Sequence, residues 1–183
     1  SKIRQAMAHR NSIYRLSNLV ELDDTVVGGK RSGKRGRGAE GKRPVLVAVE
    51  SREKGAGFLA MQAVDSVCTR TVGSFLTRHL RVGQTVKTDA LPALNVIAKQ
   101  HNHRKKITPP AEANIWLPLV HIMIGNMKKF INGTFHGVSS RYLQEYLDEF
   151  CYRFNRRFWE PELPLRLLNA CLEHTPIKIA EFH

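Results

Sequence analysis

The fold class is decided by one stretch of sequence, Pro44-Val45-Leu46-Val47-Ala48-Val49-Glu50. The five residues between the proline and the glutamate are all apolar, so both faces of a strand made from them would be hydrophobic. A strand of this kind is central in a sheet whose faces are covered. The flanking segments 19–27 and 58–67 are also rich in Val, Leu and Ala, as strands are. Three consecutive strands predict an antiparallel meander.

Helices and further strands are predicted on both sides of this meander. A helix over 2–15 precedes it, and a helix over 69–80 follows it, with Thr69 or Thr71 as the cap. The remaining predicted elements are a strand at 84–89, a helix at 91–99, a short strand near 105–108, a long helix that carries His121 and Lys128, a helix at 139–157 and a last short helix at 161–172. This order predicts an α/β fold of ribonuclease-H-like (integrase-type) architecture, with a mixed five-stranded sheet flanked by helices.

The segment 139–157 has the clearest helical pattern in the chain. Its aromatic residues recur every four positions beside Leu143 and Leu147. They continue an aliphatic face, so we expect them to pack in the core rather than to stack on bases. These residues are Tyr142, Tyr146, Phe150 and Phe154.

Composition indicates one basic domain. The chain has 183 residues, of which 42% are hydrophobic, enough for a substantial core. Its 29 Lys and Arg residues against 16 Asp and Glu give a net charge of +13, which favours a polyanionic partner such as nucleic acid. The alternative is a basic protein without such a partner.

Several other classes of protein do not fit. Cys68, Cys151 and Cys171 have no C-x-x-C spacing and are odd in number, so neither a disulfide framework nor a zinc site is indicated. No apolar stretch approaches the roughly 20 residues that cross a bilayer, and residues 1–10 lack a signal-peptide core. We therefore expect a soluble cytoplasmic protein with no membrane partner.

Four residues far apart in sequence suit a metal-dependent phosphoryl-transfer site. Asp23 and Asp89 each stand in a short β-like run, and carboxylates on strands can hold a pair of Mg²⁺ or Mn²⁺ ions. His121 and Lys128 are seven residues apart, almost two helical turns, so they project from one face. Gly125 lies between them on that face and would let DNA or metal come close. We predict Asp23, Asp89 and His121 as metal ligands and Lys128 as a phosphate ligand.

Each of these residues also has an ordinary structural interpretation. Asp23 or its neighbour Asp24 could simply form a turn, and Asp89 could cap the following helix. His121 lies among apolar residues and could be a buried core histidine. Lys128 and Lys129 could form a solvated helix face.

The segment from Lys30 to Arg43 differs most from the rest of the chain. It has seven basic residues, four glycines and one acid, so it predicts a mobile hairpin or loop. Its position after Asp23 favours a clamp on a DNA backbone, and the alternative is a loop whose charge only aids solubility. His101 and His103 stand in another basic stretch, predicted to be a surface loop without metal. The predicted DNA-binding residues are Lys30, Arg31, Lys34, Arg35, Arg37, Lys128 and Lys129.

The chain resembles the DDE-type transposases of bacterial insertion sequences, in the ISXO-type group related to eukaryotic Merlin elements. The resemblance covers roughly residues 1 to 160. It is carried by Val20-Glu21-Leu22-Asp23-Asp24-Thr25, Gly28-Gly29-Lys30, Lys87-Thr88-Asp89, Leu117-Pro118 through His121 to Met127-Lys128-Lys129, Gly133-Thr134-Phe135-His136-Gly137-Val138-Ser139, Tyr146-Leu147-Asp148-Glu149-Phe150 and Arg153-Phe154-Asn155-Arg156-Arg157.

The resemblance implies roles for particular residues. Asp23 and Asp89 match the two metal-binding aspartates of the family, and Lys128 matches its basic helix residue. His121 stands where most DDE enzymes have Glu, a histidine variant that favours Mn²⁺ over Mg²⁺. Two divalent ions are expected.

The resemblance also implies an organisation and an activity. Residues 1–18 would end a linker helix from an upstream module, residues 19–160 would form the catalytic domain, and residues 161–183 would be a C-terminal helix and tail. The expected activity is cleavage and strand transfer of an insertion sequence. It would act on element ends and target DNA, as a homodimer or larger assembly, in a bacterial cytoplasm at the nucleoid. The alternatives are a catalytically decayed DNA-binding domain of the same fold and a ribonuclease-H-type nuclease.

Overall fold

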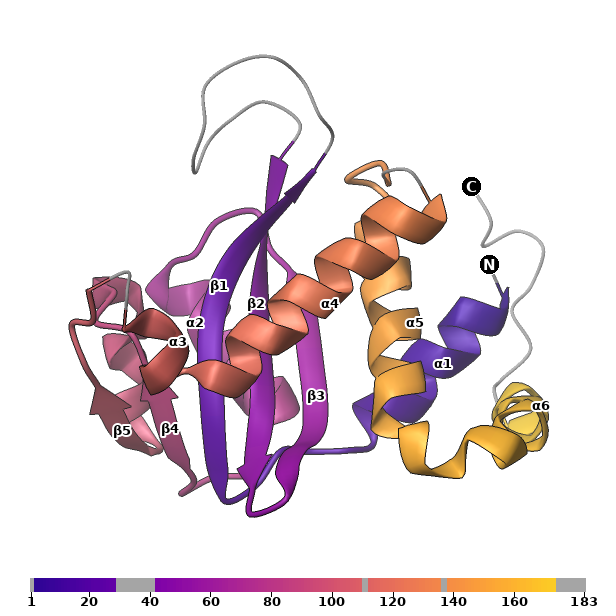
Figure 1. Cartoon of the computed structure of the whole chain (residues 1–183), viewed down its shortest axis with the longest axis horizontal. Coiled ribbons are helices and arrows are strands. Elements are labelled where there is room, and N and C mark those ends of the chain that lie inside the picture. The colour runs from indigo at the N-terminus through magenta and orange to yellow at the C-terminus, as the bar shows by residue number, and fades with distance from the viewer. Residues whose placement is uncertain (1, 29–41, 110–111, 136–137, 174–183) are drawn as a thin grey trace.

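A computed structural model describes residues 2–28, 42–109, 112–135 and 138–173. Figure 1 shows a central sheet with α4 running across its front and α5, α1 and α6 beyond the edge formed by β3. The elements are α1 (Lys2–Ser12), β1 (Leu19–Gly28), β2 (Lys42–Arg52), β3 (Gly55–Ala63), α2 (Thr69–His79), β4 (Thr85–Thr88), the 3₁₀ helix η1 (Pro92–Lys99), β5 (Asn102–Lys105), α3 (Ala113–Trp116), α4 (Pro118–Phe135), α5 (Leu143–Asn155), the 3₁₀ helix η2 (Arg157–Glu162) and α6 (Leu163–Glu173).

The sheet has five strands in the order β3-β2-β1-β4-β5. β2 is antiparallel to both of its neighbours, while β4 is parallel to β1 and to β5. This mixed five-stranded sheet confirms the predicted ribonuclease-H-like fold and the predicted meander. Residues Val45 to Val49 are fully buried in β2, an interior strand, as their apolar sequence predicts.

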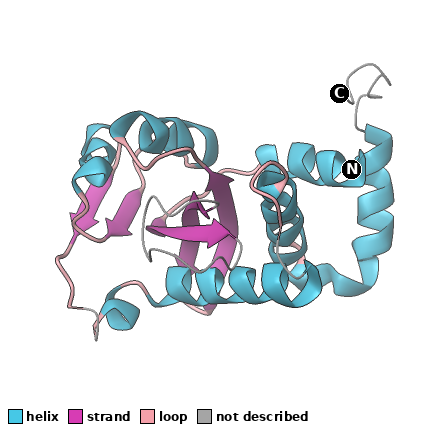
Figure 2. Ribbon diagram, turned by 90° about the horizontal axis from the view of Figure 1, so that it is seen from above, coloured by secondary structure: helices cyan, strands magenta, loops and turns pink. Residues whose placement is uncertain are grey.

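Helices cover both faces of the sheet (Figure 2), and each face has its own core. On one face, Val20 and Leu22 of β1 pack with residues of α2 and η1. On the other, Val47 of β2 packs with residues of α4 and α5. Side chains alternate along a strand, so Glu21 and Asp23 point toward the face that α4 covers.

Four details differ from the sequence prediction. The predicted helix at 91–99 is a 3₁₀ helix, and β5 at 102–105 begins before the predicted 105–108. The predicted basic loop with His101 and His103 is therefore largely this edge strand. Cys68 is the N-cap of α2, and Thr71 Oγ1 accepts a hydrogen bond from its N–H at 3.0 Å.

The prediction for the aromatic stripe of α5 was wrong in part. Leu143, Leu147 and Cys151 form the buried stripe of the helix. Tyr142, Tyr146 and Phe150 each directly precede one of these three buried residues, and Phe154 continues the same four-residue spacing. One residue is about 100° of helix rotation, so the aromatic side chains point about 100° away from the buried stripe. Tyr142 is 47% exposed, whereas Phe150 is half-buried against the core.

α1 packs against α5 and α6 at the end of the sheet that carries β3 (Figure 1). Ala6 and Met7 are its buried residues, and Arg4 Nε donates to Glu149 Oε2 at 2.8 Å. The domain boundaries at 18 and 160 stay predictions. Within the described part of the chain, no helix has both the length and the hydropathy to span a membrane.

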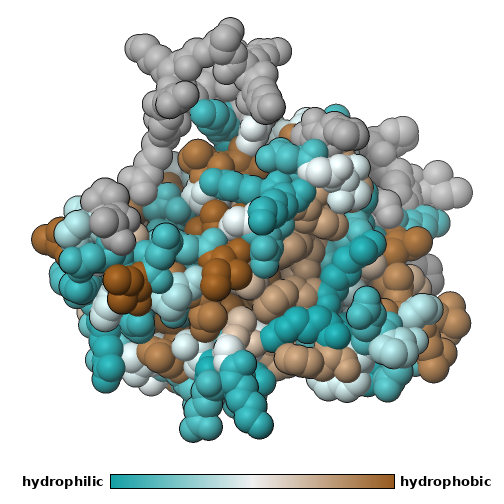
Figure 3. Space-filling view, viewed as in Figure 1, coloured by the Kyte–Doolittle hydropathy of each residue, from teal (hydrophilic) through white to brown (hydrophobic). Residues whose placement is uncertain are grey.

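α6 leaves apolar side chains uncovered in the structure. Leu165, Leu168 and Leu172 are 62%, 55% and 75% exposed. Hydrophobic residues gather over α6 at the lower right of the face shown in Figure 3.

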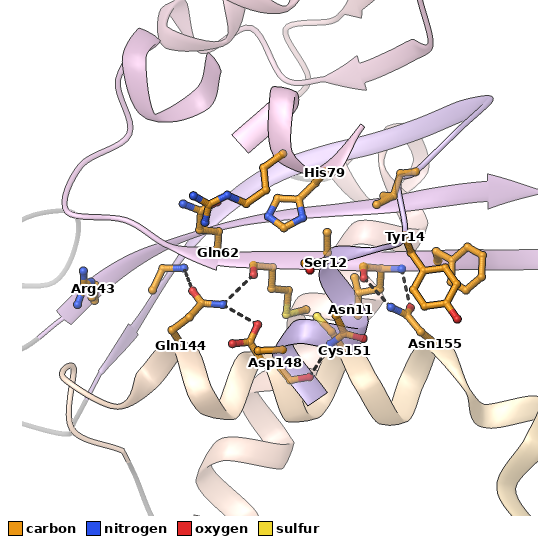
Figure 4. Close-up of a pocket in the computed structure, with 18 of the residues that line it drawn as sticks. Asn11, Ser12, Tyr14, Arg43, Gln62, His79, Gln144, Asp148, Cys151 and Asn155 are labelled. Atoms are coloured by element: carbon orange, nitrogen blue, oxygen red, sulfur yellow. Dashed lines mark hydrogen bonds between the residues drawn. The ribbon is translucent and has the colours of Figure 1, made fainter. Parts of the chain in front are cut away.

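Two amide side chains of α5 cover the outer edge of β3. Asn155 accepts from the N–H of Leu59 at 2.8 Å and donates to its C=O at 3.0 Å, and Gln144 accepts from the N–H of Ala63 at 2.8 Å. Figure 4 shows both side chains at the wall of a cavity of about 430 Å³ along this edge. Because their edge groups are already bonded, these positions of β3 are not available to another strand.

Candidate functional site

Asp23 reaches the site from the middle of β1. It lies opposite Val47 of β2, and Val47 belongs to the core beneath α4. Alternation therefore directs Asp23 to the α4 face and Asp24 to the other. Asp23 Oδ1 accepts a hydrogen bond from the N–H of Asp24 at 2.8 Å.

Asp89 comes to the same region through the pairing of β4 with β1. The parallel register places Lys87 beside Glu21, and two more residues along each chain bring Asp89 level with Asp23. Neighbouring strands are about 4.8 Å apart, so the two carboxylates belong to one locality. Asp89 Oδ1 also accepts from the N–H of Leu91 at 3.1 Å, but Leu91 is itself the N-cap of η1, so this bond is a local turn before the helix and the alternative of Asp89 as the helix cap is wrong.

His121 lies in the first turns of α4 and faces Asp23. Its Nε2 is 3.1 Å from Asp23 Oδ2, and its Nδ1 is 2.8 Å from Asn114 Oδ1. The side chain is 24% exposed, so the alternative of a histidine enclosed in the core is wrong. Both ring nitrogens have polar partners, and the orientation of the imidazole is therefore specified.

Glu21 is a residue of this region to which the sequence analysis assigned no role. It is only 2% exposed, and one oxygen, Oε2, accepts the N–H groups of Leu119 at 2.8 Å and Val120 at 3.0 Å. These are unpaired donors of the first turn of α4, which begins at Pro118 directly after Leu117, a residue whose side chain has no hydrogen-bond acceptor. Glu21 thereby fixes the start of α4, and with it His121, to β1.

Negative charge accumulates around Asp23. Burial is the largest cause of its raised pKa, and the nearby charges of Asp24 and Asp89 raise that pKa further. The Asp24 N–H and His121 act in the opposite direction. A folded site that disfavours ionisation of its own carboxylate is one that a cation would stabilise.

The donor chemistry of these residues fits a divalent cation. Carboxylate oxygens suit Mg²⁺ and Mn²⁺, and an imidazole nitrogen suits Mn²⁺ better than Mg²⁺. Asp23 makes a direct hydrogen bond with His121, whereas its interaction with Asp89 is electrostatic repulsion without a hydrogen bond between the two side chains among the described contacts. Among residues 2–28, 42–109, 112–135 and 138–173, no group of three or more His, Cys, Asp or Glu side chains is arranged as a metal cluster.

Lys128 lies outside the cluster of Asp23 and His121. It lies seven positions after His121 on α4, which is about 10 Å along the helix axis. Burial and the nearby charge of Lys42 lower the pKa of Lys128. A Cβ added at Gly125, between them in sequence, would meet nothing within 4 Å, so this side of α4 is open. Lys129 is exposed.

Five of the predicted DNA ligands belong to the basic segment between β1 and β2. Lys30, Arg31, Lys34, Arg35 and Arg37 fall in 29–41, outside the described residues. The residues on either side of this segment, Gly28 and Lys42, are paired between β1 and β2. The described basic residues at this end of the sheet include Lys42 and Lys128.

His101 and His103 do not join the site. His101 is 8% exposed, and His103 Nε2 makes a 2.8 Å hydrogen bond with Thr88 Oγ1. His103 therefore joins β5 to the end of β4, and His101, predicted to lie in a surface loop, is buried just before β5.

Comparison with known proteins gives one match to a family. The model of the ISXO2-like transposase domain matches residues 15–155. No curated protein matches the chain.

Solved structures of Mos1 transposase are also similar to the chain. The Mos1 transposase paired-end complex with left transposon end is 15% identical over 93% of this chain, with a TM-score of 0.41. The Mos1 strand transfer complex is also 15% identical over 93% of this chain, with a TM-score of 0.40. The chain spans 60% of the length of each of these Mos1 chains.

Proposed function

The chain belongs to the family of ISXO2-like transposase domains, and on that premise we propose that it performs DNA cleavage and strand transfer at the site around Asp23. Membership confirms the predicted DDE-type transposase. The relation to Merlin elements and the histidine variant of the third position stay predictions. The observation that carries the proposal is the 3.1 Å approach of His121 Nε2 to Asp23 Oδ2, on the face where Asp89 also arrives.

Asp23, Asp89 and His121 would hold Mg²⁺ or Mn²⁺, with two ions expected. When bound, such ions activate the attacking oxygen and stabilise the charge that develops on the phosphate. The raised pKa of Asp23, caused first by burial and then by the charges of Asp24 and Asp89, supports this assignment, because a bound cation would stabilise the ionised carboxylate. Glu21 keeps His121 near Asp23 by holding the first turn of α4.

Lys128 and Lys42 would bind the DNA backbone beside this site. Both are at the end of the sheet where β1 and β2 lead into the basic segment 29–41. Burial first, and then the charge of Lys42, lower the pKa of Lys128, and a phosphate bound between the two lysines would stabilise both charges. DNA would therefore be held mainly through phosphates, with an affinity that falls as salt rises.

Cleavage and joining are both in-line displacements at phosphorus, so one site can serve both steps. Water would attack first at an element end. The 3′-hydroxyl released there would then attack target DNA. Pairing of two ends by a homodimer or larger assembly, and action at a bacterial nucleoid, belong to the same proposal.

A strand-transfer assay tests this function. The chain would be incubated with labelled element-end DNA and a target plasmid, in Mg²⁺ or Mn²⁺, beside Asp89→Asn and a Lys54→Ala control. We expect cleaved and joined products from the unmodified chain and the control, and neither product from Asp89→Asn. Cleavage without joining would identify a nuclease instead. Binding without either product would identify a decayed domain, and full strand transfer by Asp89→Asn would contradict the site.

A further inference from the structure

We propose that the exposed leucines of α6 form the interface of a two-fold symmetric dimer, in which α6 of one copy packs antiparallel against α6 of a second copy. The proposal goes beyond the proposed function, which includes a homodimer or larger assembly without a contact surface. The leucines are Leu165, Leu168 and Leu172, each more than half exposed.

These leucines form one stripe on the outer side of α6. Their spacing, three residues and then four, is that of the a and d positions along which two helices pack. The opposite side of α6 carries Ala170, which is buried, and α6 packs there against α1. The stripe is therefore the outer side of a helix that is already fixed at its back.

Apolar surface continues beside the stripe. Pro164 and Leu167 of α6 line a cavity of about 510 Å³ together with Met7 and Tyr152. Figure 3 shows hydrophobic side chains gathered at this end of the molecule. A contiguous apolar surface with polar residues at its rim marks a site of contact with a protein or a membrane.

The charges at the rim favour a protein over DNA or an anionic membrane. Exposed acids, Glu162 and Glu173, stand at the two ends of the stripe. Arg166 Nη2 is 2.8 Å from Glu162 Oε2, and Arg10 Nη1 is 3.5 Å from Glu173 Oε2. Each end thus presents one acid and one base. A surface that carries both signs complements this pattern, whereas a row of phosphates would be repelled by the acids.

A second copy in antiparallel orientation supplies such a surface. Two-fold rotation places Leu168 near the symmetry axis and sets Leu165 against Leu172 of the second copy. Arg166 and Glu173 lie on one flank of α6, about 100° and 80° around the helix from Leu165. The same rotation brings this flank of both copies together, so Arg166 of each copy approaches Glu173 of the other. The antiparallel pair matches leucine with leucine and acid with base.

Sedimentation equilibrium of the chain without DNA or metal tests this interface. We expect the unmodified chain to approach the mass of two chains as its concentration rises to about 100 μM. Leu168→Glu would place two carboxylates together at the axis, so this variant should keep the mass of one chain. Val82→Glu is the matched control, at a 75% exposed position between α2 and β4, and it should dimerise like the unmodified chain.

A mixing experiment separates a second copy from any other occupant of the stripe. Leu168→Lys should also be monomeric alone, whereas an equimolar mixture with Leu168→Glu should dimerise, because opposite charges then meet at the axis. If residues 174–183 of the same chain or a different protein covered the stripe, the unmodified chain would stay monomeric, which would overturn the proposal. A dimer that Leu168→Glu leaves intact, or a mixture that stays monomeric, would also overturn it. Absence of strand transfer by the unmodified chain would count against the proposed function alone.

Discussion

Replacement of Glu21 tests how the start of α4 is fixed. Its buried carboxylate accepts two backbone N–H groups through one oxygen, at 2.8 and 3.0 Å. A hydrogen bond to a charged group contributes about 1.5–3 kcal/mol. The two bonds of Glu21 would sum to about 3–6 kcal/mol before the cost of burying the charge is subtracted. We expect Glu21→Ala to lower the free energy of unfolding by about 2–4 kcal/mol.

The amide variant separates the hydrogen bonds from the charge. Both N–H groups reach a single oxygen, so the carbonyl of Glu21→Gln can accept both bonds. That variant loses mainly the attraction between a carboxylate and the helix N-terminus, about 1 kcal/mol. Glu21→Gln is therefore expected to lie much closer to the unmodified chain than Glu21→Ala.

Urea unfolding followed by tryptophan fluorescence measures these differences. With a slope of about 2 kcal/mol per molar urea, the alanine variant should unfold at a midpoint lower by about 1–2 M. Glu53→Ala, at an exposed position of the turn after β2, should change the free energy by less than about 0.5 kcal/mol. If Glu21→Ala unfolds like this control, or if Glu21→Gln is as destabilised as Glu21→Ala, then the two hydrogen bonds of Glu21 do not hold the start of α4.

Three further predictions concern other parts of the molecule. Burial raises the pKa of Asp148 to about 6 from an ordinary 3.8, so the folded chain binds the extra proton between these values and loses stability as pH rises through 6. Asp148→Asn should add about 1–3 kcal/mol to the free energy of unfolding at pH 8 and almost nothing at pH 4, and an equal gain at both would contradict the cause. Asn155→Ala leaves two buried backbone groups of β3 unpaired and should cost about 2–5 kcal/mol in urea unfolding, whereas a loss below about 1 kcal/mol would show that water replaces it. Lys128→Ala should weaken DNA binding and reduce the slope of log affinity against log salt by about 1, while Lys54→Ala, beyond the opposite end of β2, should leave the slope unchanged; equal effects would count against a phosphate contact at Lys128.

The sheet was predictable because its strands carry local patterns. The apolar run 45–49 specifies a strand buried on both faces, and alternation in β1 places Asp23 toward α4. β5 was predicted too late in the chain, because its residues Asn102 to Lys105 are all polar and give no hydrophobic alternation. A parallel edge strand of this kind is defined by its backbone bonds to β4.

The environment of His121 was ambiguous in the sequence for a physical reason. Val120, Met123 and Met127 form the buried stripe of α4, while Ile122 is 52% exposed. Because Ile122, beside the histidine, is apolar but exposed, the pattern of apolar residues in the sequence does not show which side of α4 faces solvent. The orientation of the ring therefore had to come from the structure.

Glu21 and Asn114 show what the sequence does not encode locally. The partners of Glu21 are backbone N–H groups nearly one hundred positions later, and any residue types could supply them. The partner of Asn114 is seven positions away, on a helix that begins only after α3 ends. The sequence shows a glutamate two residues before Asp23 on the same face of a strand, but it does not show that this glutamate is buried.

The central claim is that Asp23, Asp89 and His121 bind divalent cations together. Anomalous diffraction from crystals of the chain grown with Mn²⁺ tests it most directly. We expect a peak within about 2.5 Å of carboxylate oxygens of Asp23 and Asp89 and of His121 Nε2. A strong peak elsewhere, with none at these three side chains, would contradict it.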